Sequence, residues 1–156
     1  MKSTLRDLMA QRRLPILEQE GLICALEWLA EQIQDASETE VDLSIAPASE
    51  KGRPPLGVEL AMFRVAQLAL ANVLEHAQAR HIAINLLVRP TQVVMEILDD
   101  GVGLVQDQKG PTSNLGNRGL GFLEMHRQAL AAEGDLQIRR QALTGTEVIF
   151  KWPRQL

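Results

Sequence analysis

Helical and strand-like patterns follow one another along this 156-residue chain in an order that favours one architecture. Apolar residues at helical spacing run from about Glu20 to Ala36, and a strand alternation follows over 41–45. A stretch rich in Leu and Ala, without Pro or Gly, predicts a long helix over 58–78. The other predicted elements are a short helix within 3–13, strands over 82–88 and 93–98, a long loop over 99–121, a helix over about 120–132 that stops at Gly134, and a terminal hairpin. This order predicts an α+β sandwich with helices on one face of a mixed sheet.

The composition and charge of the chain exclude several classes of protein. Hydrophobic residues make up 46% and charged residues 23%, which is typical of a globular domain with its own core. The net charge of -4 and the aromatic content of 3% disfavour binding to nucleic acid. A single cysteine, Cys24, excludes an internal disulfide and a cysteine-rich zinc site. No run of 18 apolar residues and no signal peptide are present, so a cytoplasmic domain is expected.

Three polar or glycine-containing segments stand out from these patterns. Asn72 lies within the long helix, where Asn has poor propensity, and shares a helical face with residues 68 and 76. The segment Asp99-Asp100-Gly101-Val102-Gly103 follows a strand, so a carboxylate can accept a hydrogen bond from an amino group while glycines let a flat ligand approach. Gly119-Leu120-Gly121 begins a helix, where free N–H groups favour phosphate. Each segment also has a simpler explanation, namely a solvent-facing Asn, a polar turn or a hinge.

Together and in this order, the segments resemble the ATP-binding catalytic domain of two-component sensor histidine kinases, which has the Bergerat fold with a mostly antiparallel sheet. The resemblance is strongest to kinases that signal to LuxR-type response regulators, and it extends over nearly the whole chain. In that family the helix around Asn72 is the N box, Asp99-x-Gly101-x-Gly103 binds adenine, and Gly119-x-Gly121 ends the ATP lid. The segment Gly145-Thr146-x-Val148 also fits, because the family's Thr helps to hold adenine.

The resemblance implies a site for ATP and Mg²⁺. Asp99 would accept the adenine amino hydrogen, and Asn72 would be the metal ligand, offering its side-chain oxygen to Mg²⁺. His76 would contact phosphate or only pack between helices, and the resemblance leaves both roles open. No residue is expected to be catalytic. The residues expected to bind the cofactor are Asn72, His76, Asp99, Gly101, Gly103, Arg118, Gly119, Gly121 and Thr146.

The resemblance also implies a division of the chain and a set of partners. Residues 1–18 are expected to be the tail of a dimerisation helix with its linker, and 19–156 the ATP-binding domain with its lid over about 104–118. The family's phosphate acceptor is a His followed by an acidic residue, and no His of this chain has that context. We therefore expect the acceptor on a dimerisation domain absent from this chain, within a homodimeric parent. The chain alone is expected to be monomeric, a LuxR-type response regulator is the further expected partner, and membrane attachment of the parent stays open.

Three residues depart from the family's pattern near the expected phosphates. Leu68 stands where the family has a Glu that orients the reaction and can act as a base, which leucine cannot do. Glu75 replaces a Lys or Arg, and Glu124 replaces a Gly. A like charge beside a triphosphate is unfavourable by about 1 kcal/mol unless Mg²⁺ offsets it. The pattern therefore keeps the adenine pocket and weakens the phosphate end.

Three functions remain open at this point. The first is a catalytic domain that binds Mg-ATP and transfers the γ-phosphoryl group to a histidine on another domain. The second is a degenerate kinase-like domain that acts as a regulatory or interaction module with weak or no ATP binding, which Leu68 and Glu75 suggest. The third is a relative on the same fold, such as an anti-sigma-factor serine kinase or another ATPase. A P-loop is excluded because the chain has no Gly-x-x-x-x-Gly-Lys-Ser/Thr segment.

Overall fold

The computed structural model describes residues 15–46, 51–77, 79–102, 116–141 and 144–154, with the backbone alone at 76–77 and 116–120. Five strands form one sheet in the order β1-β2-β3-β5-β4. β1 pairs with β2 in parallel, and the other neighbours are antiparallel. The strands are β1 (Glu40–Ile45), β2 (His81–Arg89), β3 (Gln92–Asp99), β4 (Asp135–Arg140) and β5 (Thr146–Trp152). The predicted mixed, mostly antiparallel sheet is therefore confirmed.

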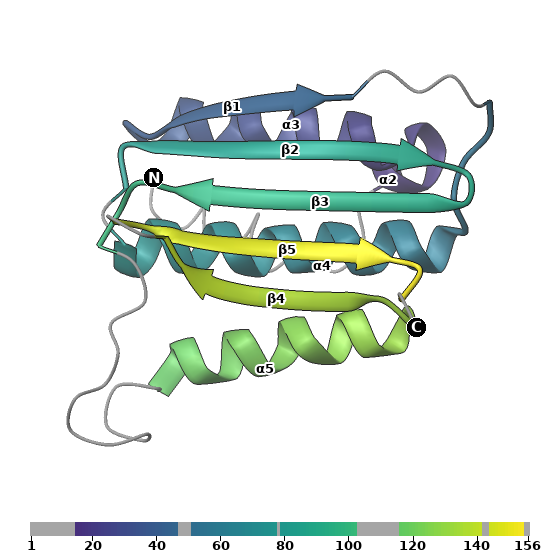
Figure 1. Cartoon of the computed structure of the whole chain (residues 1–156). Coiled ribbons are helices and arrows are strands. Elements are labelled where there is room, and N and C mark those ends of the chain that lie inside the picture. Colours follow the sequence, from purple (N-terminus) through teal and green to yellow (C-terminus); the bar gives the residue numbers. More distant parts are fainter. Residues whose placement is uncertain (1–14, 47–50, 78, 103–115, 142–143, 155–156) are drawn as a thin grey trace.

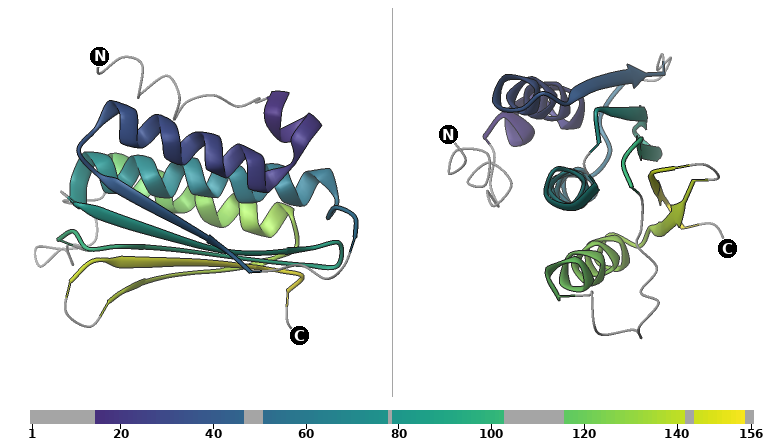
Figure 2. Two further views of the ribbon diagram at one scale, coloured as in Figure 1. Left: turned by 90° about the horizontal axis from the view of Figure 1, so that it is seen from above. Right: turned by 90° about the vertical axis from the view of Figure 1, so that its left-hand side faces the viewer.

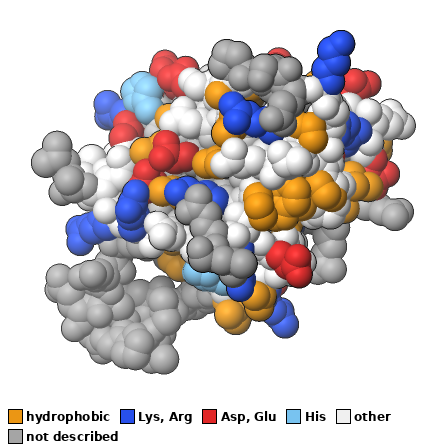
Figure 3. All heavy atoms as spheres, turned by 45° about the vertical axis from the view of Figure 1, so that its right-hand side comes forward, with side chains coloured by type: hydrophobic (Ala, Val, Ile, Leu, Met, Phe, Trp, Pro, Cys, Tyr) orange, Lys and Arg blue, Asp and Glu red, His pale blue; other side chains and the backbone are white. Residues whose placement is uncertain are grey.

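The helices cover one face of this sheet and leave the other face open, as Figures 1 and 2 show. They are α2 (Pro15–Glu20), α3 (Leu22–Ala36), α4 (Leu56–Asn72) with the π-helical turn η1 (Val73–Ala77), and α5 (Gly116–Ala131). On the surface seen in Figure 3, acidic and basic side chains are interspersed around hydrophobic ones. The fold is thus the predicted two-layer sandwich, with one helical layer.

The core lies between the two layers, and the strand alternation explains it. Ile82, Ile84 and Leu86 of β2 are buried, as are the alternate residues of β3. The central helix α4 contributes a long row of buried residues and packs against α5. Among the described residues, the continuous helical stretch Leu56–Glu75 is long and apolar enough to cross a membrane by length and composition alone. Most of this stretch is buried inside the protein, which is what a central core helix requires.

Three helical features differ from the predictions. The short helix α2, over Pro15–Glu20, was not predicted. The long helix ends in a π-helical turn, which the apolar pattern does not reveal. α5 begins at Gly116, four residues before the predicted Leu120, so residues 116–118 of the expected lid are helical. The helix predicted within 3–13 lies outside the described residues.

The end of α5 depends on a glycine for an unexpected reason. The left-handed residue there is Glu133, with φ 59°, and not the predicted stop Gly134. The Gly134 amide donates to the carbonyl of Ala129 at 2.9 Å, which closes the last turn. A Cβ at position 134 would lie 2.6 Å from Phe150 Cε1 and 2.7 Å from the Lys151 carbonyl oxygen. Gly134 therefore allows the chain to pass close to β5.

An ion pair between the buried Glu59 and the partly exposed Arg53 joins α2, α3 and α4. Glu59, in the first turn of α4, is 1% exposed, and its Oε2 accepts a hydrogen bond from the Leu22 amide at 2.9 Å. Its Oε1 accepts from Arg53 Nη2 at 2.6 Å and Nε at 3.2 Å. Arg53 also donates to the Leu17 carbonyl of α2 at 3.0 Å. One carboxylate thus caps α3 and holds α2 against α4.

Candidate functional site

The buried carboxylate of Asp99 is the centre of the candidate site. Asp99 ends β3, is 5% exposed, and follows the alternate β3 residues that face the helices. Its Oδ1 accepts a hydrogen bond from the Gly101 amide at 2.9 Å. Burial raises the pKa of Asp99. The backbone amides of Gly101 and Thr146 oppose this rise, because their hydrogen bonds favour the charged form. The side chain is therefore a hydrogen-bond acceptor on the helix-covered face of the sheet. Keeping it charged there costs desolvation free energy, which a donor group on a ligand would offset.

The Gly145-Thr146 segment lies against Asp99. Thr146 begins β5 and is 7% exposed. Gly145 has φ 94°, and a Cβ there would lie 1.8 Å from the Asp99 carbonyl oxygen. Only glycine fits this position, both for its backbone conformation and for the space. The structure thus brings together Asp99, Gly101 and Thr146, three of the residues predicted to hold adenine.

Asn72 stands at a change of helical geometry. It is the last residue of α4, is partly buried, and is followed directly by the π-helical turn over Val73–Ala77. The predicted common face holds for Leu68 and Asn72, which are both α-helical. Residue 76 lies in the π-helical turn, and its place on this face stays a prediction. The side chain of His76 lies outside the described residues.

The remaining predicted residues lie at the start of α5 or beyond the described part of the chain. Arg118, Gly119 and Gly121 are in the first two turns of α5, with only the backbone described for the first two. A Cβ at Gly121 would meet no described atom within 4 Å, so packing there does not require glycine. Gly103 and lid residues 104–115 are outside the described residues. The end of α4, the end of β3, the start of β5 and the start of α5 all lie at the left-hand edge of Figure 1.

Of the three departures from the family pattern, the structure describes Glu124 most fully. Its carboxylate accepts a hydrogen bond from Gln128 Nε2 at 2.9 Å and lies 3.5 Å from Arg127 Nη1. The Gln128 bond, with Arg127 and the nearby Arg64, lowers the pKa of Glu124. Its negative charge is therefore compensated within the helical layer. Leu68 packs against the core, and the Glu75 side chain is exposed.

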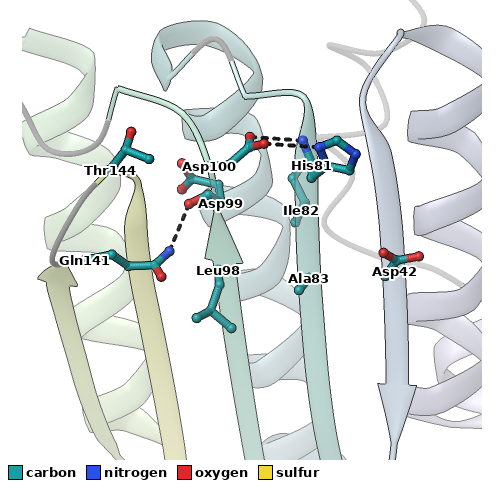
Figure 4. A pocket seen from close by; sticks show the side chains of 9 residues that line it. All are labelled: Asp42, His81, Ile82, Ala83, Leu98, Asp99, Asp100, Gln141 and Thr144. Atoms are coloured by element: carbon teal, nitrogen blue, oxygen red, sulfur yellow. Dashed lines mark hydrogen bonds and ion pairs between the residues drawn. The ribbon is translucent and has the colours of Figure 1, made fainter.

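A second set of polar residues lies behind Asp99, on the open face of the sheet. A cleft of about 460 Å³ opens there, and Figure 4 shows its lining. The Asp100 carboxylate accepts from the amides of Arg80 at 2.8 Å and His81 at 3.0 Å and lies 3.1 Å from His81 Nδ1. Burial alone would raise the pKa of Asp100, but these hydrogen bonds outweigh it and lower the pKa. The lining residues are Asp42, His81, Ile82, Ala83, Leu98, Asp99, Asp100, Gln141 and Thr144.

Sequence reasoning missed two contributors to this part of the molecule. His81 also approaches Glu40 of β1, with 3.1 Å between Nε2 and Oε2, and the Asp100 hydrogen bond raises its pKa. Gln141 donates from Nε2 to the Asp99 carbonyl at 2.9 Å. The doubled aspartate at 99–100 was a signal for the first of these contacts. Nothing in the sequence pattern indicated the second, because it joins residues 42 positions apart.

Curated proteins with similar sequences include two bacterial sensor kinases or sensors by name. The chain is 30% identical over 137 residues to the histidine-protein kinase/phosphatase DegS of Brevibacillus brevis, covering 88% of this chain and 33% of that protein. It is 27% identical over 147 residues to the nitrate/nitrite sensor NarX of Escherichia coli, covering 93% of this chain and 23% of that protein. The chain thus spans a third or less of the length of these two curated relatives.

Solved structures show the same fold. The histidine kinase domain of a blue-light activated kinase from Erythrobacter litoralis superposes with a TM-score of 0.62 at 21% identity, over 85% of this chain and 60% of that one. The ATP-binding domain of PrrB from Mycobacterium tuberculosis gives a TM-score of 0.56 at 17% identity, over 85% and 93% of the two chains. At these identities the likeness concerns the fold, which is the Bergerat fold expected above.

A family model decides the membership. Residues 57–156, from the start of α4 to the end of the chain, match the model described as histidine kinase-, DNA gyrase B- and HSP90-like ATPase. The matched part contains the Asp99 and Gly101 turn, Thr146, Asn72 and the start of α5. The chain therefore belongs to the family of histidine kinase-, DNA gyrase B- and HSP90-like ATPases.

Proposed function

We propose that this domain is the ATP-binding catalytic domain of a sensor histidine kinase, which binds Mg-ATP and transfers the γ-phosphoryl group to a histidine on a dimerisation domain outside this chain. The observation that carries the proposal is the buried carboxylate of Asp99, held by the Gly101 amide beside Thr146. The family and the names of the curated relatives support it.

Adenine recognition is assigned to Asp99 and Thr146. A buried carboxylate with a raised pKa gains from a donor, and the adenine amino group provides one. Guanine presents a carbonyl oxygen at that position, which would face the carboxylate without a proton between them. Gly101 and Gly103 would let the flat base approach the backbone. The site therefore selects adenine through a largely buried acceptor.

Metal and phosphate binding are assigned to the end of α4 and the start of α5. Asn72 would offer its amide oxygen to Mg²⁺, a hard cation that prefers oxygen and keeps water and phosphate ligands. No described group of three or more His, Cys, Asp or Glu residues could hold a metal by itself, which fits a cation that enters with the nucleotide. Arg118, Gly119, Gly121 and His76 would face the phosphates under a lid over about 104–118, whose last residues are helical.

Phosphoryl transfer in this domain would depend on positioning and charge compensation. Leu68 cannot take a proton, so the attacking imidazole must arrive with its nucleophilic nitrogen free. When bound, Mg²⁺ would compensate the charge that develops on the phosphoryl oxygens. Glu124 repels the phosphate groups less than its charge suggests, because Arg127 and Arg64 compensate that charge. The weakened phosphate end therefore does not exclude transfer.

The whole protein's organisation belongs to the same proposal. Residues 1–18 would be the end of a dimerisation helix with its linker, and 19–156 the ATP-binding domain. The partners would be the phosphoacceptor domain of a homodimeric parent and a LuxR-type response regulator, with no nucleic acid. This chain alone would be a monomer and would work in the cytoplasm, whether or not the parent is anchored in a membrane. The relatives named as sensor kinases support these assignments.

Calorimetric titration with a non-hydrolysable ATP analogue, with and without Mg²⁺, tests the proposal. We expect saturable binding that Mg²⁺ strengthens. Asp99→Asn should abolish the binding, whereas the same substitution at Asp42, exposed on the open face, should leave it within about twofold. If a folded sample binds no nucleotide, the domain acts as the degenerate regulatory module that Leu68 and Glu75 suggest. Transfer to a protein serine instead of a histidine would indicate the serine-kinase relative.

A further inference from the structure

The turn between β4 and β5 donates two side-chain hydrogen bonds to the backbone of the adenine-binding segment. Gln141, directly after β4, donates from Nε2 to the Asp99 carbonyl at 2.9 Å (Figure 4). The same Nε2 lies 3.4 Å from the Thr146 carbonyl oxygen. Thr144 donates from Oγ1 to the Gly101 carbonyl. The turn therefore holds both ends of the Asp99-Asp100-Gly101 segment from the open face of the sheet.

A backbone hydrogen bond joins Gln141 and Gly145, the two residues at either end of the turn. The Gln141 amide donates to the Gly145 carbonyl at 3.0 Å, which closes the turn, and Gly145 itself lies directly against the Asp99 carbonyl oxygen. The last β3–β5 register pair is Leu98 with Glu147. Asp99 lies one residue beyond that pair, and Gln141 supplies a donor for its carbonyl there.

On the other side of the segment, the start of β2 provides a second anchor. The Asp100 carboxylate is held by the amides of Arg80 and His81 and by the His81 ring. Asp99 is thus held from two sides. Gln141 donates to its backbone carbonyl, and the start of β2 binds the side chain of the adjacent Asp100. Within the described residues, the carboxylate of Asp99 itself receives only the backbone amides of Gly101 and Thr146.

We propose that Gln141 is a positioning residue for adenine selectivity: it fixes the Asp99 carbonyl on the open face and thereby aims the Asp99 carboxylate and Thr146 at the nucleotide. This inference rests on the proposed nucleotide site. Gln141 does not touch the base, because it reaches Asp99 from the opposite face of the sheet. Its loss lets the end of β3 relax, and the acceptor that distinguishes adenine from guanine is no longer held in one direction.

Gln141→Met removes the donor and keeps nearly the same side-chain length. We expect the Kd of the ATP analogue to rise about tenfold, and the Kd of a GTP analogue, which gains nothing from Asp99, to change by less than about twofold. Selectivity then falls about fivefold or more. Gln137→Met, on the exposed side of β4, is the matched control and should change neither Kd. Gln141→Lys keeps an N–H donor at similar reach and should recover most of the affinity.

Hydrogen exchange separates this inference from the proposed function. The Gly101 amide donates to Asp99 Oδ1, so its exchange rate reports how firmly the carboxylate is held without any nucleotide. Gln141→Met should raise that rate about tenfold and leave the amide of Ile97, in the middle of β3, unchanged. If the wild-type chain binds no ATP and the rate still rises, Gln141 positions Asp99 and the nucleotide proposal fails. If Gln141→Met matches Gln137→Met in both exchange and ATP affinity, the inference is overturned, as it also is if both nucleotides weaken equally.

Discussion

Glu59 and Asp99 are both buried carboxylates, and their surroundings differ in a way that separates structure from function. Glu59, 1% exposed, receives three N–H groups, two of them from the cation Arg53. Asp99, 5% exposed, receives only neutral backbone amides from the part of the chain that the structure describes, and burial raises its pKa. A buried charge with a cationic partner is satisfied within the fold. A buried charge without one has capacity left for a ligand, which is why we place the nucleotide at Asp99 and not at Glu59.

The comparison predicts its largest effect for nucleotide binding. Asp99→Asn replaces an acceptor-only group by an amide that can turn a donor towards adenine, so affinity for the ATP analogue should fall more than about a thousandfold. Thermal unfolding should stay within a few degrees of wild type or rise, because the substitution removes a buried charge without a cationic partner. Calorimetry and a melting curve measure both. Affinity retained within about tenfold would contradict the assignment of Asp99 to adenine.

Glu59 should behave in the opposite way. Glu59→Gln leaves the Arg53 guanidinium beside a neutral amide and weakens the cap of α3, so the free energy of unfolding should fall by about 3 kcal/mol. The Kd of the ATP analogue, measured where the variant is still folded, should change less than about threefold. Urea denaturation measures the first quantity and calorimetry the second. A large loss of affinity in a stable variant would show that the two carboxylates are not separate in function.

The pH dependence of binding sharpens the contrast further. Because burial raises the pKa of Asp99 above its ordinary value of 3.8, the folded chain binds this proton more tightly than the unfolded chain. This group therefore contributes stability at low pH that is lost as the pH rises through the raised pKa. ATP affinity should show the opposite pH dependence. It should weaken about tenfold as the pH falls through the same pKa, because the carboxylate becomes protonated. Titrations between pH 4 and 7 check this, and a parallel fall in affinity and in stability would contradict it.

Glu124 should give the smallest effect of the set. Its charge is compensated by Arg127 and Arg64 and held by Gln128, so Glu124→Gln should change the Kd of the Mg-ATP analogue by less than about threefold. A gain of more than about tenfold would mean that this carboxylate does repel the phosphates. Titrations at low and moderate salt make the comparison, since an unscreened repulsion would weaken as salt is added.

Much of the fold could be predicted because it depends on local patterns. The alternation of β2 and β3 and the Leu/Ala-rich helix gave the right layers. The Asp99, Gly101 and Thr146 segments were found together as predicted, because a carboxylate after a buried strand and a glycine before another strand leave a visible signature. The π turn after Asn72, the helix α2 and the early start of α5 were missed, because their signals are no stronger than those of the loops and helices around them.

The sequence by itself determined the fold class and the family, and it singled out Asp99 as the carboxylate that we propose for adenine binding. The tertiary structure decided which polar residues support that carboxylate and which only hold the fold. Gln141 reaches Asp99 across 42 positions and Glu59 reaches Leu22 across 37, and both contacts exist only after the sheet and the helices have packed. Periodicity and spacing describe neighbours along the chain. The hydrogen-bond partners of a buried charge depend on which distant segments the packing brings beside it.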